Sequence, residues 1–257
     1  MMNKLFKNKV VVITGGLGDI GQAIALKFAS QGASVALCGM RPSDNATDFL
    51  DQVKEQHGVP CIYEQVDVSD SEKVQDWLQH VEDRLGIPSL IIANAATVTM
   101  AKVLEITADQ WFREINVNLN GAFYVAQYAT RRMVEEKLTG HVIFIGSWAG
   151  HAVHAHIPAY SVSKAAMRML CKCMALELAP HHIMVNELAP GYVQAGLSGK
   201  VWEQNPGLCE EAVLKVPTGK IMSAEAVAEQ VIYLCRPENE HITGSTLLMD
   251  GGLSLRT

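Results

Sequence analysis

The sequence predicts an α/β fold, a doubly wound sheet of seven parallel strands in a single domain spanning residues 1–257. Short β-rich runs alternate with longer helical patterns from end to end, which is the pattern of parallel sheets with helical crossovers. Several of the β-rich runs are continuously apolar, as expected of strands covered by helices on both faces. No Ser/Pro-rich linker divides the chain, and its 49% hydrophobic content suffices for one large core.

This alternation places seven strands and six helical stretches along the chain. The expected strands are Val10–Thr14, Ser34–Cys38, Cys61–Val66, Leu90–Asn94, His141–Gly146, Met184–Leu188 and Thr246–Met249. The expected helices span residues 19–30, 45–57, 70–85, 108–136, 158–179 and 223–235. In such sheets ligands bind beyond the carboxyl ends of the strands, where the strand order reverses, and the motifs below fall at those ends.

The first strand, VVVIT, runs into a glycine-rich turn and then into a helix. Residues of this turn and of the helix start are candidate nucleotide contacts: Gly15, Leu17, Gly18, Asp19, Ile20 and Gly21. Glycines between a strand and a helix let the backbone approach a pyrophosphate, which the N–H groups and the dipole of the helix then face. The alternative is a tight turn whose glycines serve only its geometry. The strand–turn–helix context favours a nucleotide site.

The ends of the second and third strands bear on the kind of nucleotide. An acidic residue after the second strand would bind the ribose hydroxyls of NAD, but Gly39 stands there. Arg41 lies close enough to meet a 2′-phosphate, which favours NADP over NAD; a solvated loop arginine is the alternative. After the third strand, Asp67 is placed to accept from an adenine amino group, with Val68 beside it. The other role open to Asp67 is the N-cap of the next helix.

A serine, a tyrosine and a lysine form the most informative cluster. Ser147 follows the fifth strand, and Tyr160 and Lys164 follow in the segment AYSVSK. Positions i and i+4 share one helix face, so the phenol and the ammonium can point into one small volume. A cation about 4 Å away at an effective dielectric of about 20 is worth about three pKa units. We therefore expect Lys164 to bring the pKa of Tyr160 towards neutrality, where acid–base catalysis works best; an ordinary surface helix is the alternative.

Composition argues against several classes of protein. A net charge of −6 argues against a general binder of nucleic acids or anionic membranes. No apolar run reaches the roughly 18 residues of a membrane span. The six cysteines include no CxxC pair, so we expect reduced thiols in a cytoplasmic protein and no metal site.

Six motifs occur in order along the chain: TGGLGDIG, IANAA, NVNLNGAF, IGSWAG followed by AYSVSK, NELAPGY and ITGSTLLMDGG. Together they resemble the short-chain dehydrogenase/reductase family over residues 8–252. The resemblance implies a Rossmann sheet, assembly into homotetramers or homodimers, and a small-molecule substrate. It implies an oxidoreductase that transfers a hydride between NAD(P) and a secondary alcohol or ketone.

The resemblance also implies roles for individual residues. The implied catalytic tetrad is Asn118, Ser147, Tyr160 and Lys164. Tyr160 would exchange a proton with the substrate oxygen, and Ser147 would donate a hydrogen bond to the same atom. Lys164 would lower the pKa of Tyr160 and bind the nicotinamide ribose, while Asn118 would hold a water in line with Lys164. The implied cofactor contacts include Tyr160 and Lys164 themselves, Asn94 after the fourth strand, and Pro190, Gly191 and Val193 near the nicotinamide.

Two positions depart from the family pattern. Asp19 stands where the fingerprint has a glycine, and a carboxylate aimed at a pyrophosphate would repel it. We expect Asp19 to face away or to cap the helix, leaving Gly18 to provide the close approach. Ala195 stands where a threonine often binds the nicotinamide carboxamide, so one hydrogen bond, about 1 kcal/mol, is missing.

The substrate side is less specific. Candidate substrate contacts are Ser147, Trp148, His154, Tyr160 and Trp202. Three histidines, His151, His154 and His156, lie in the loop between Ser147 and Tyr160. We expect them to line the substrate pocket or to be ordinary loop residues. A metal site is not expected, because there is no obvious fourth ligand. Residues 192–216 resemble a substrate lid, although an amphipathic helix pair packed on the body explains the same pattern. Its apolar residues are Leu197, Trp202, Leu208 and Val213.

Several functions remain open at this stage. Within the family, the chain is a 3-oxoacyl thioester reductase acting on an acyl-carrier protein, a sugar or polyol dehydrogenase, or another ketoreductase. Glu135, Glu136 and Lys137, expected near the cleft, give little support to docking of an acidic carrier. An epimerase or dehydratase with tightly held nucleotide and a non-catalytic regulatory protein are the other classes. Helices 108–136 and 158–179, apolar on more than one side, suggest burial against a sister subunit.

Overall fold

The computed structural model describes residues 4–196, 199, 202 and 206–256. Within them, seven parallel strands form one sheet in the order β3-β2-β1-β4-β5-β6-β7. Their bounds are β1 Val10–Thr14, β2 Ser34–Gly39, β3 Cys61–Gln65, β4 Leu90–Ala93, β5 Gly140–Ile145, β6 Ile183–Pro190 and β7 Thr246–Met249. The predicted doubly wound fold is confirmed, and strand ends differ from the prediction by two residues or fewer.

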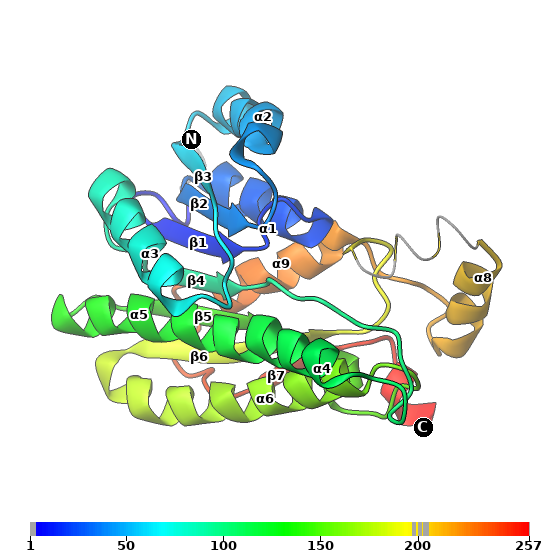
Figure 1. The fold of residues 1–257 in the computed structure, drawn as a ribbon. Helices are drawn as coiled ribbons and strands as arrows, with labels where there is room; N and C mark the ends of the chain where they lie inside the picture. The colour runs from blue at the N-terminus through cyan, green and yellow to red at the C-terminus, as the bar shows by residue number, and fades with distance from the viewer. Residues whose placement is uncertain (1–3, 197–198, 200–201, 203–205, 257) are drawn as a thin grey trace.

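Helices cover both faces of the sheet (Figure 1). Their bounds are α1 Asp19–Ser30, α2 Thr47–His57, α3 Ser71–Leu85, α4 Ala108–Ile115, α5 Gly121–Glu135, α6 Pro158–Leu178, α8 Pro206–Lys215 and α9 Ala224–Leu234. One apolar core joins the sheet to α1, α2 and α9, and a second joins its other face to α3, α5 and α6. The central strands β1, β4 and β6 are buried along their whole length, whereas the edge strands β3 and β7 are only half-buried.

The strand order reverses between β1 and β4. From β1 the chain winds through β2 to β3 at one edge, and from β4 it winds the other way through β5 and β6 to β7. The carboxyl ends of β1 and β4 therefore leave a crevice between diverging crossovers, where ligands bind in this class of sheet. The helix α8 stands beside that edge, at the right of Figure 1.

The predicted helix 108–136 is interrupted. A capping box between Thr107 and Gln110 starts α4, and α5 begins at Gly121. Between them Asn116–Asn120 form a π-helical turn, in which the N–H of Gly121 reaches back to the carbonyl of Asn116. Such wide turns are rare and are frequent at functional sites. The apolar periodicity alone did not show this break.

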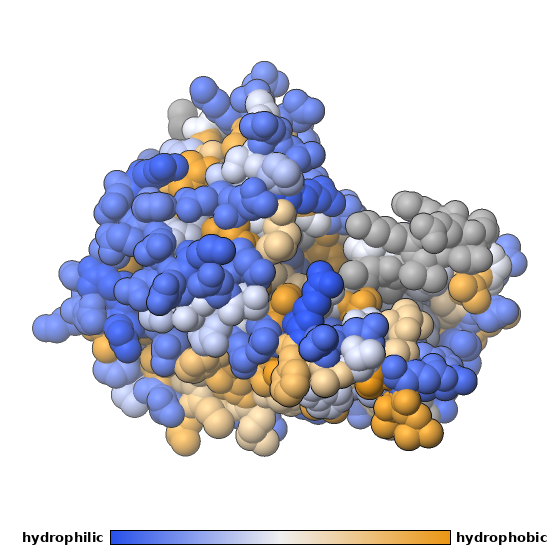
Figure 2. All heavy atoms as spheres, viewed as in Figure 1, coloured by the Kyte–Doolittle hydropathy of each residue, from blue (hydrophilic) through white to orange (hydrophobic). Residues whose placement is uncertain are grey.

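Apolar side chains are unevenly distributed over the surface. In Figure 2 polar side chains cover most of the upper part of this face, whereas apolar ones gather along its lower rim, where Figure 1 places α6. Among the described residues, no helix is long and apolar enough to cross a bilayer.

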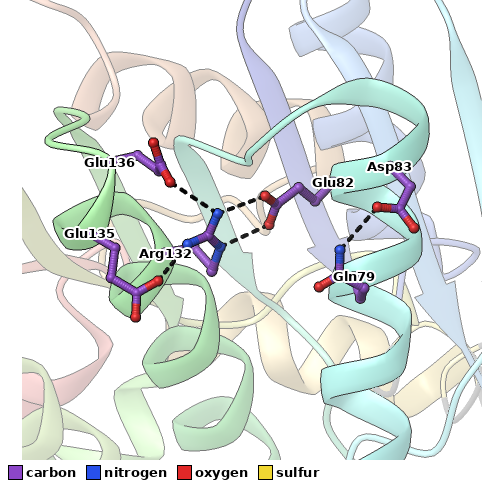
Figure 3. Close-up of polar contacts among 6 residues, drawn as sticks. All are labelled: Gln79, Glu82, Asp83, Arg132, Glu135 and Glu136. Carbon is purple, nitrogen blue, oxygen red and sulfur yellow. Dashed lines mark hydrogen bonds and ion pairs between the residues drawn. The ribbon is translucent and has the colours of Figure 1, made fainter.

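An arginine ties α5 to α3 at the end of the molecule opposite the strand carboxyl ends (Figure 3). The Arg132 guanidinium donates to both Glu82 carboxylate oxygens, at 3.0 and 2.8 Å, and also to Glu135 and Glu136. These three carboxylates raise its pKa. Since β5 starts just after this end of α5, Glu135 and Glu136 lie far from the crevice. Their expected position near the cleft is wrong.

Candidate active site

The glycine-rich turn leaves the start of α1 open. Gly15 has φ +65°, a left-handed conformation that favours glycine. A Cβ on Gly21 would lie 2.4 Å from the carbonyl oxygen of Gly15, so only glycine lets α1 pack this close to the turn. Gly18 is the N-cap and supplies no side-chain cap. The first N–H groups of α1 are therefore left to an external acceptor.

Asn94 binds the first strand to the fourth at the reversal point. Its side-chain amide donates to the carbonyls of Thr14 and Gly15, at 2.9 and 3.3 Å. The Thr14 hydroxyl accepts from the backbone N–H groups of Asn94 and Ala95, at 3.0 and 2.9 Å. Asn94 thus fixes the floor of the turn at the predicted end of β4.

Asp19 faces the segment that follows β6. Its Oδ2 accepts from the backbone N–H of Gly196 at 2.6 Å. Of the two alternatives expected for Asp19, it does not cap the helix, because it occupies the first helical position after the N-cap Gly18; its carboxylate faces away, towards Gly196. Its side chain instead links the glycine-rich turn to the start of the predicted lid. Between them lies a hollow of about 790 Å³, bordered also by Gln22 and Trp202.

The residues expected at the adenosine end lie on the far side of the turn. Arg41 is exposed beyond β2, and its carbonyl accepts from the Tyr63 hydroxyl at 2.7 Å. Oδ1 of Asp67 accepts from the N–H and hydroxyl of Ser69, at 3.0 and 2.7 Å. The alternative that Asp67 caps the next helix is wrong, because Asp70 caps α3. Val68 is buried against Gly121 at the start of α5.

Ser147, Tyr160 and Lys164 converge at the carboxyl end of β5. Lys164 is 2% exposed, and its Nζ lies 5.6 Å from the centre of the Tyr160 ring. The same Nζ donates to the carbonyl of Ile145 at 2.7 Å. The Ser147 side chain interacts with the Tyr160 hydroxyl closely enough to lower its pKa. Oγ of Ser147 also accepts from the N–H of Ala149 at 3.1 Å.

The expected direction of the Tyr160 pKa is wrong for this structure. Burial raises it to about 12, the Ser147 hydrogen bond lowers it, and the charge of Glu114 raises it. The ammonium of Lys164 lies against the ring and a backbone carbonyl, and burial lowers its own pKa to about 8. Desolvation outweighs the attraction that the i, i+4 spacing predicts. Tyr160 is thus held protonated at neutral pH.

Asn118, in the π-helical turn, is fully buried and fully engaged. Its amide oxygen accepts from the N–H of Thr97 at 2.8 Å. Its amide nitrogen donates to the carbonyl of Thr97 at 2.9 Å and to the hydroxyl of Ser163 at 3.1 Å. Ser163 immediately precedes Lys164, so Asn118 anchors the lysine-bearing turn of α6.

A carboxylate that the sequence analysis missed lies beside Tyr160. Glu114 on α4 is 0% exposed and accepts from the N–H of Thr99. Its Oε2 has no hydrogen-bond partner among the described residues. Burial raises its pKa, while its negative charge opposes ionisation of Tyr160. The signal available in the sequence was an acidic residue within an amphipathic helix, which ordinarily marks a solvated face.

The segment after β6 closes the other side. Pro190 ends β6, Gly191 packs so close to Asp250 that a Cβ would lie 2.7 Å from its Cα, and Val193 bridges to Met222. Ala195 is largely buried. Of the predicted lid residues, Leu208 is exposed and Val213 is half-buried, whereas Leu197 lies outside the described residues.

Four aromatic rings connect this segment to the serine. The ring centroid of Trp148 lies 5.4 Å from that of His154 and 5.5 Å from that of Tyr192. The ring centroids of Tyr192 and Trp202 are 5.9 Å apart. The structure therefore brings the three predicted aromatic contacts together through Tyr192, which the sequence analysis missed although it follows PG directly.

The other two histidines of this loop are held by hydrogen bonds. His151 is bound at Nδ1 by Arg168 at 2.6 Å, and the carbonyl of His156 accepts from the N–H of Ala101 at 2.8 Å. Over the described ranges, no group of three His, Cys, Asp or Glu residues could hold a metal.

The residues present fit a nicotinamide dinucleotide. The uncapped start of α1 and the cradle of Gly15 and Gly21 would hold its pyrophosphate. Tyr160, Lys164 and the turn at Pro190 and Gly191 would border its nicotinamide end. When bound, the dinucleotide would supply or accept a hydride.

Comparison with known proteins identifies the family. A family model described as enoyl-(acyl carrier protein) reductase matches residues 17–254. The chain belongs to the short-chain dehydrogenase/reductase family. It is 30% identical to a 3-oxoacyl-[acyl-carrier-protein] reductase of Thermotoga maritima over 250 residues, 96% of this chain and 98% of that protein. It is 32% identical to the D-beta-hydroxybutyrate dehydrogenase of Rhizobium meliloti over 256 residues, 95% of this chain and 98% of that protein.

Solved structures agree with this assignment. A short-chain type dehydrogenase/reductase from Mycobacterium marinum superposes with a TM-score of 0.89 at 30% identity, covering 98% of both chains. This short-chain dehydrogenase/reductase is therefore an oxidoreductase of a family that uses NAD(P).

Proposed function

We propose that this enzyme interconverts a secondary alcohol and a ketone with NADP, using Ser147, Tyr160 and Lys164 as its reacting groups. The observation that carries the proposal is the convergence of a buried ammonium, a phenol and a hydroxyl at the end of β5, beside the strand reversal. Asn118 holds this cluster through Ser163.

Each residue has a definite part in the chemistry. Because Tyr160 is protonated at neutral pH, it can donate a proton to a carbonyl oxygen. Ser147, whose side chain interacts with the Tyr160 hydroxyl, can donate to the same oxygen and hold it in place. The ammonium of Lys164 stabilises the phenolate that remains after the proton leaves. In the reverse direction, the phenolate takes the proton of an alcohol.

The preference for NADP rests on the end of β2. Gly39 leaves no carboxylate there to bind the ribose hydroxyls, and the exposed Arg41 follows. Arg41 is free to turn towards a 2′-phosphate, because the contact with Tyr63 uses only its backbone carbonyl. NADPH should therefore support faster turnover than NADH at equal concentration.

The substrate class we favour is a 3-oxoacyl or 3-hydroxyacyl compound. The two curated relatives named above share this unit, one on a carrier protein and one as a free acid. The displacement of Glu135 and Glu136 from the crevice removes the objection to a carrier-bound substrate. Sugars stay on the test panel as the alternative, since the aromatic rings around Tyr192 also suit a sugar face.

Replacing Tyr160 by Phe tests the chemistry. Loss of the hydroxyl should lower turnover of a ketone panel about a hundredfold or more, because the proton donor is gone. NADPH binding, followed by its fluorescence, should stay near the wild-type affinity. Tyr233→Phe, on the partly exposed face of α9, is the matched control and should retain activity. Full activity in Tyr160→Phe would contradict the assignment.

We also propose that the enzyme assembles through α6. Val162, Met169 and Leu176 recur every seven residues along this helix and are 47, 59 and 81% exposed. Phe112 on the adjacent α4 is 60% exposed. Figure 2 shows apolar side chains along the lower rim, where Figure 1 draws α6, and a second copy of the chain would cover this apolar stripe. The six free thiols fit a cytoplasmic location for the assembly.

Charge on the stripe should break the assembly. Met169→Glu places a carboxylate in the buried centre of the expected interface, so the mass measured by light scattering should fall to that of a smaller species. Leu5→Glu, an exposed apolar residue far from α6, should leave the mass unchanged. An unaltered mass for Met169→Glu would exclude this face as the interface.

A further inference from the structure

A carboxylate lies inside the apolar strand β6. All eight residues of β6 are buried, and Glu187 among them is 0% exposed. It pairs with Phe144 of β5 on one side and Thr246 of β7 on the other. Oε2 accepts from the Thr246 hydroxyl at 2.6 Å. Burying a charge costs several kcal/mol unless other groups compensate it, so Glu187 needs a partner.

The other oxygen of Glu187 lies against the peptide that leads to Ser147. A Cβ on Gly146 would come within 2.0 Å of Oε1, so this oxygen fills the place of a side chain there. Oε1 has no hydrogen-bond partner among the described residues. The preceding residue, Ile145, gives its carbonyl to Nζ of Lys164 at 2.7 Å. The carboxylate of Glu187 and the ammonium of Lys164 thus both lie against the same dipeptide, Ile145–Gly146.

The groups that face Glu187 come from α6 and β7. Lys164, Arg168 and Lys172 share one face of α6 at intervals of four residues and all interact with its charge. The Cys171 thiol lies on the same helix, and its Sγ donates to the carbonyl of Val185. Lys172 is exposed, and Arg168 already binds Gly150 and His151. Lys164 is the one of the three cations that is buried, and the charge of Glu187 raises its pKa.

We propose that Glu187 is a positioning residue that keeps Lys164 charged and directed at the Ile145 carbonyl, next to Ser147. The proposal rests on the role proposed above for Lys164. Burial lowers the pKa of Lys164 to about 8, and the charge of Glu187 raises it against this effect. Burial raises the pKa of Glu187, and the hydrogen bond from Thr246, followed by the charges of Arg168 and Lys164, lowers it in return. Without this carboxylate, the ammonium would lose its proton within the physiological range.

Glu187→Gln tests the pair, because it keeps the shape and removes the charge. Lysines labelled with ¹³C at Cε report ionisation by NMR, and the Lys164 signal is the one missing from Lys164→Arg. In wild-type enzyme it should titrate near a pKa of about 8. In Glu187→Gln the midpoint should move to lower pH. Thr246→Val removes a hydrogen bond and keeps the charge, so its midpoint should stay close to that of wild type.

A second variant tests the proposal if Glu187→Gln does not fold. In Gly146→Ala combined with Glu187→Ala, the new methyl group on residue 146 takes the place that Oε1 vacates, and the same downward shift is expected. An unmoved Lys164 midpoint in either folded variant would overturn the proposal.

Turnover gives an independent readout. In Glu187→Gln the fall of kcat at high pH should begin at lower pH, with KM for the ketone little changed, and Glu187→Asp should restore most of the wild-type profile. A lowered kcat without any change in the pH profile would mean a structural role and would overturn the proposal. The NMR midpoint needs no substrate, so it can stand even if Tyr160→Phe disproves the proposed function.

Discussion

Asp19 couples two parts of the site through one side chain. At the first turn of α1, a carboxylate lies close to the place where the dinucleotide pyrophosphate would bind, yet here it accepts from the N–H of Gly196. In the proposed nucleotide site, Asp19 would therefore weaken phosphate binding while it holds Gly196 in place. Tyr160 shows the same dependence on surroundings, since burial sets the direction of its pKa against the expectation from Lys164.

The neutral substitution Asp19→Asn should strengthen NADPH binding. The amide oxygen keeps the hydrogen bond from Gly196, while repulsion of the pyrophosphate by an exposed charge, about 0.5–1 kcal/mol, disappears. Fluorescence titration should show a Kd lower by about twofold to fivefold, and the difference should shrink at high salt. Asp76→Asn, on the exposed face of α3, should leave the Kd unchanged. A weaker affinity in Asp19→Asn would mean that the carboxylate helps to order the site.

At the scale of elements, helices are positioned by contacts between residues far apart in the chain. Asn118 turns inward from the π-helical turn to bind Thr97 and Ser163, which joins α4, α5 and α6 around the site. At the other end of α5, Arg132 holds α3 through the bidentate contact with Glu82. The position of α5 is therefore fixed at both ends.

Arg132→Met should destabilise the fold modestly. Three carboxylates lose their shared cation, but the network is partly exposed, so the expected loss of stability is small. We expect Tm to fall by a few degrees at most. Thermal unfolding at low and high salt should show the difference shrinking as salt rises. Gln79→Ala, which removes only the exposed contact with Asp83 in Figure 3, should unfold like wild type.

At the scale of the whole molecule, a buried histidine is expected to contribute to stability in acid. His141, at the start of β5, is 8% exposed, and its Nδ1 has no partner among the described residues. Burial lowers its pKa from 6.5 to about 4, and Lys9 adds to this effect. Between pH 6.5 and 4, residue 141 is protonated in the unfolded chain and neutral in the folded chain. Stability contributed by neutral His141 is therefore present above 6.5 and is lost as the pH falls towards 4.

In His141→Gln the free energy of unfolding should fall less steeply as the pH is lowered. The shift is worth about 3 kcal/mol across the window, at about 1.4 kcal/mol per unit. Denaturant unfolding at a series of pH values between 6.5 and 4 should show a shallower decline for the variant than for wild type. The exposed His241→Gln should decline as steeply as wild type. Equal slopes for His141→Gln and wild type would show that another group governs acid unfolding.

The alternation of strands and helices, the glycine-rich turn and the Ser147–Tyr160–Lys164 spacing were all predictable from the sequence, because each depends on residues close together in the chain. Strand ends were placed within two residues for the same reason. The family motifs also carried the class of reaction. The break in helix 108–136 escaped prediction, since it follows from contacts that Asn118 makes with Thr97 and Ser163.

Tertiary structure alone decided the electrostatics of the site. The charge of Glu114 on α4 raises the pKa of Tyr160, and the charge of Glu187 on β6 raises that of Lys164, although acidic residues are ordinarily solvated. Tyr192 likewise joins Trp148 to Trp202 across separate segments. Local sequence specifies which chemical groups are present and which secondary structure the chain forms. Desolvation and charge pairing, by contrast, depend on neighbours that are distant in sequence. The direction of each pKa shift therefore becomes defined only when the sheet and its helices have packed together.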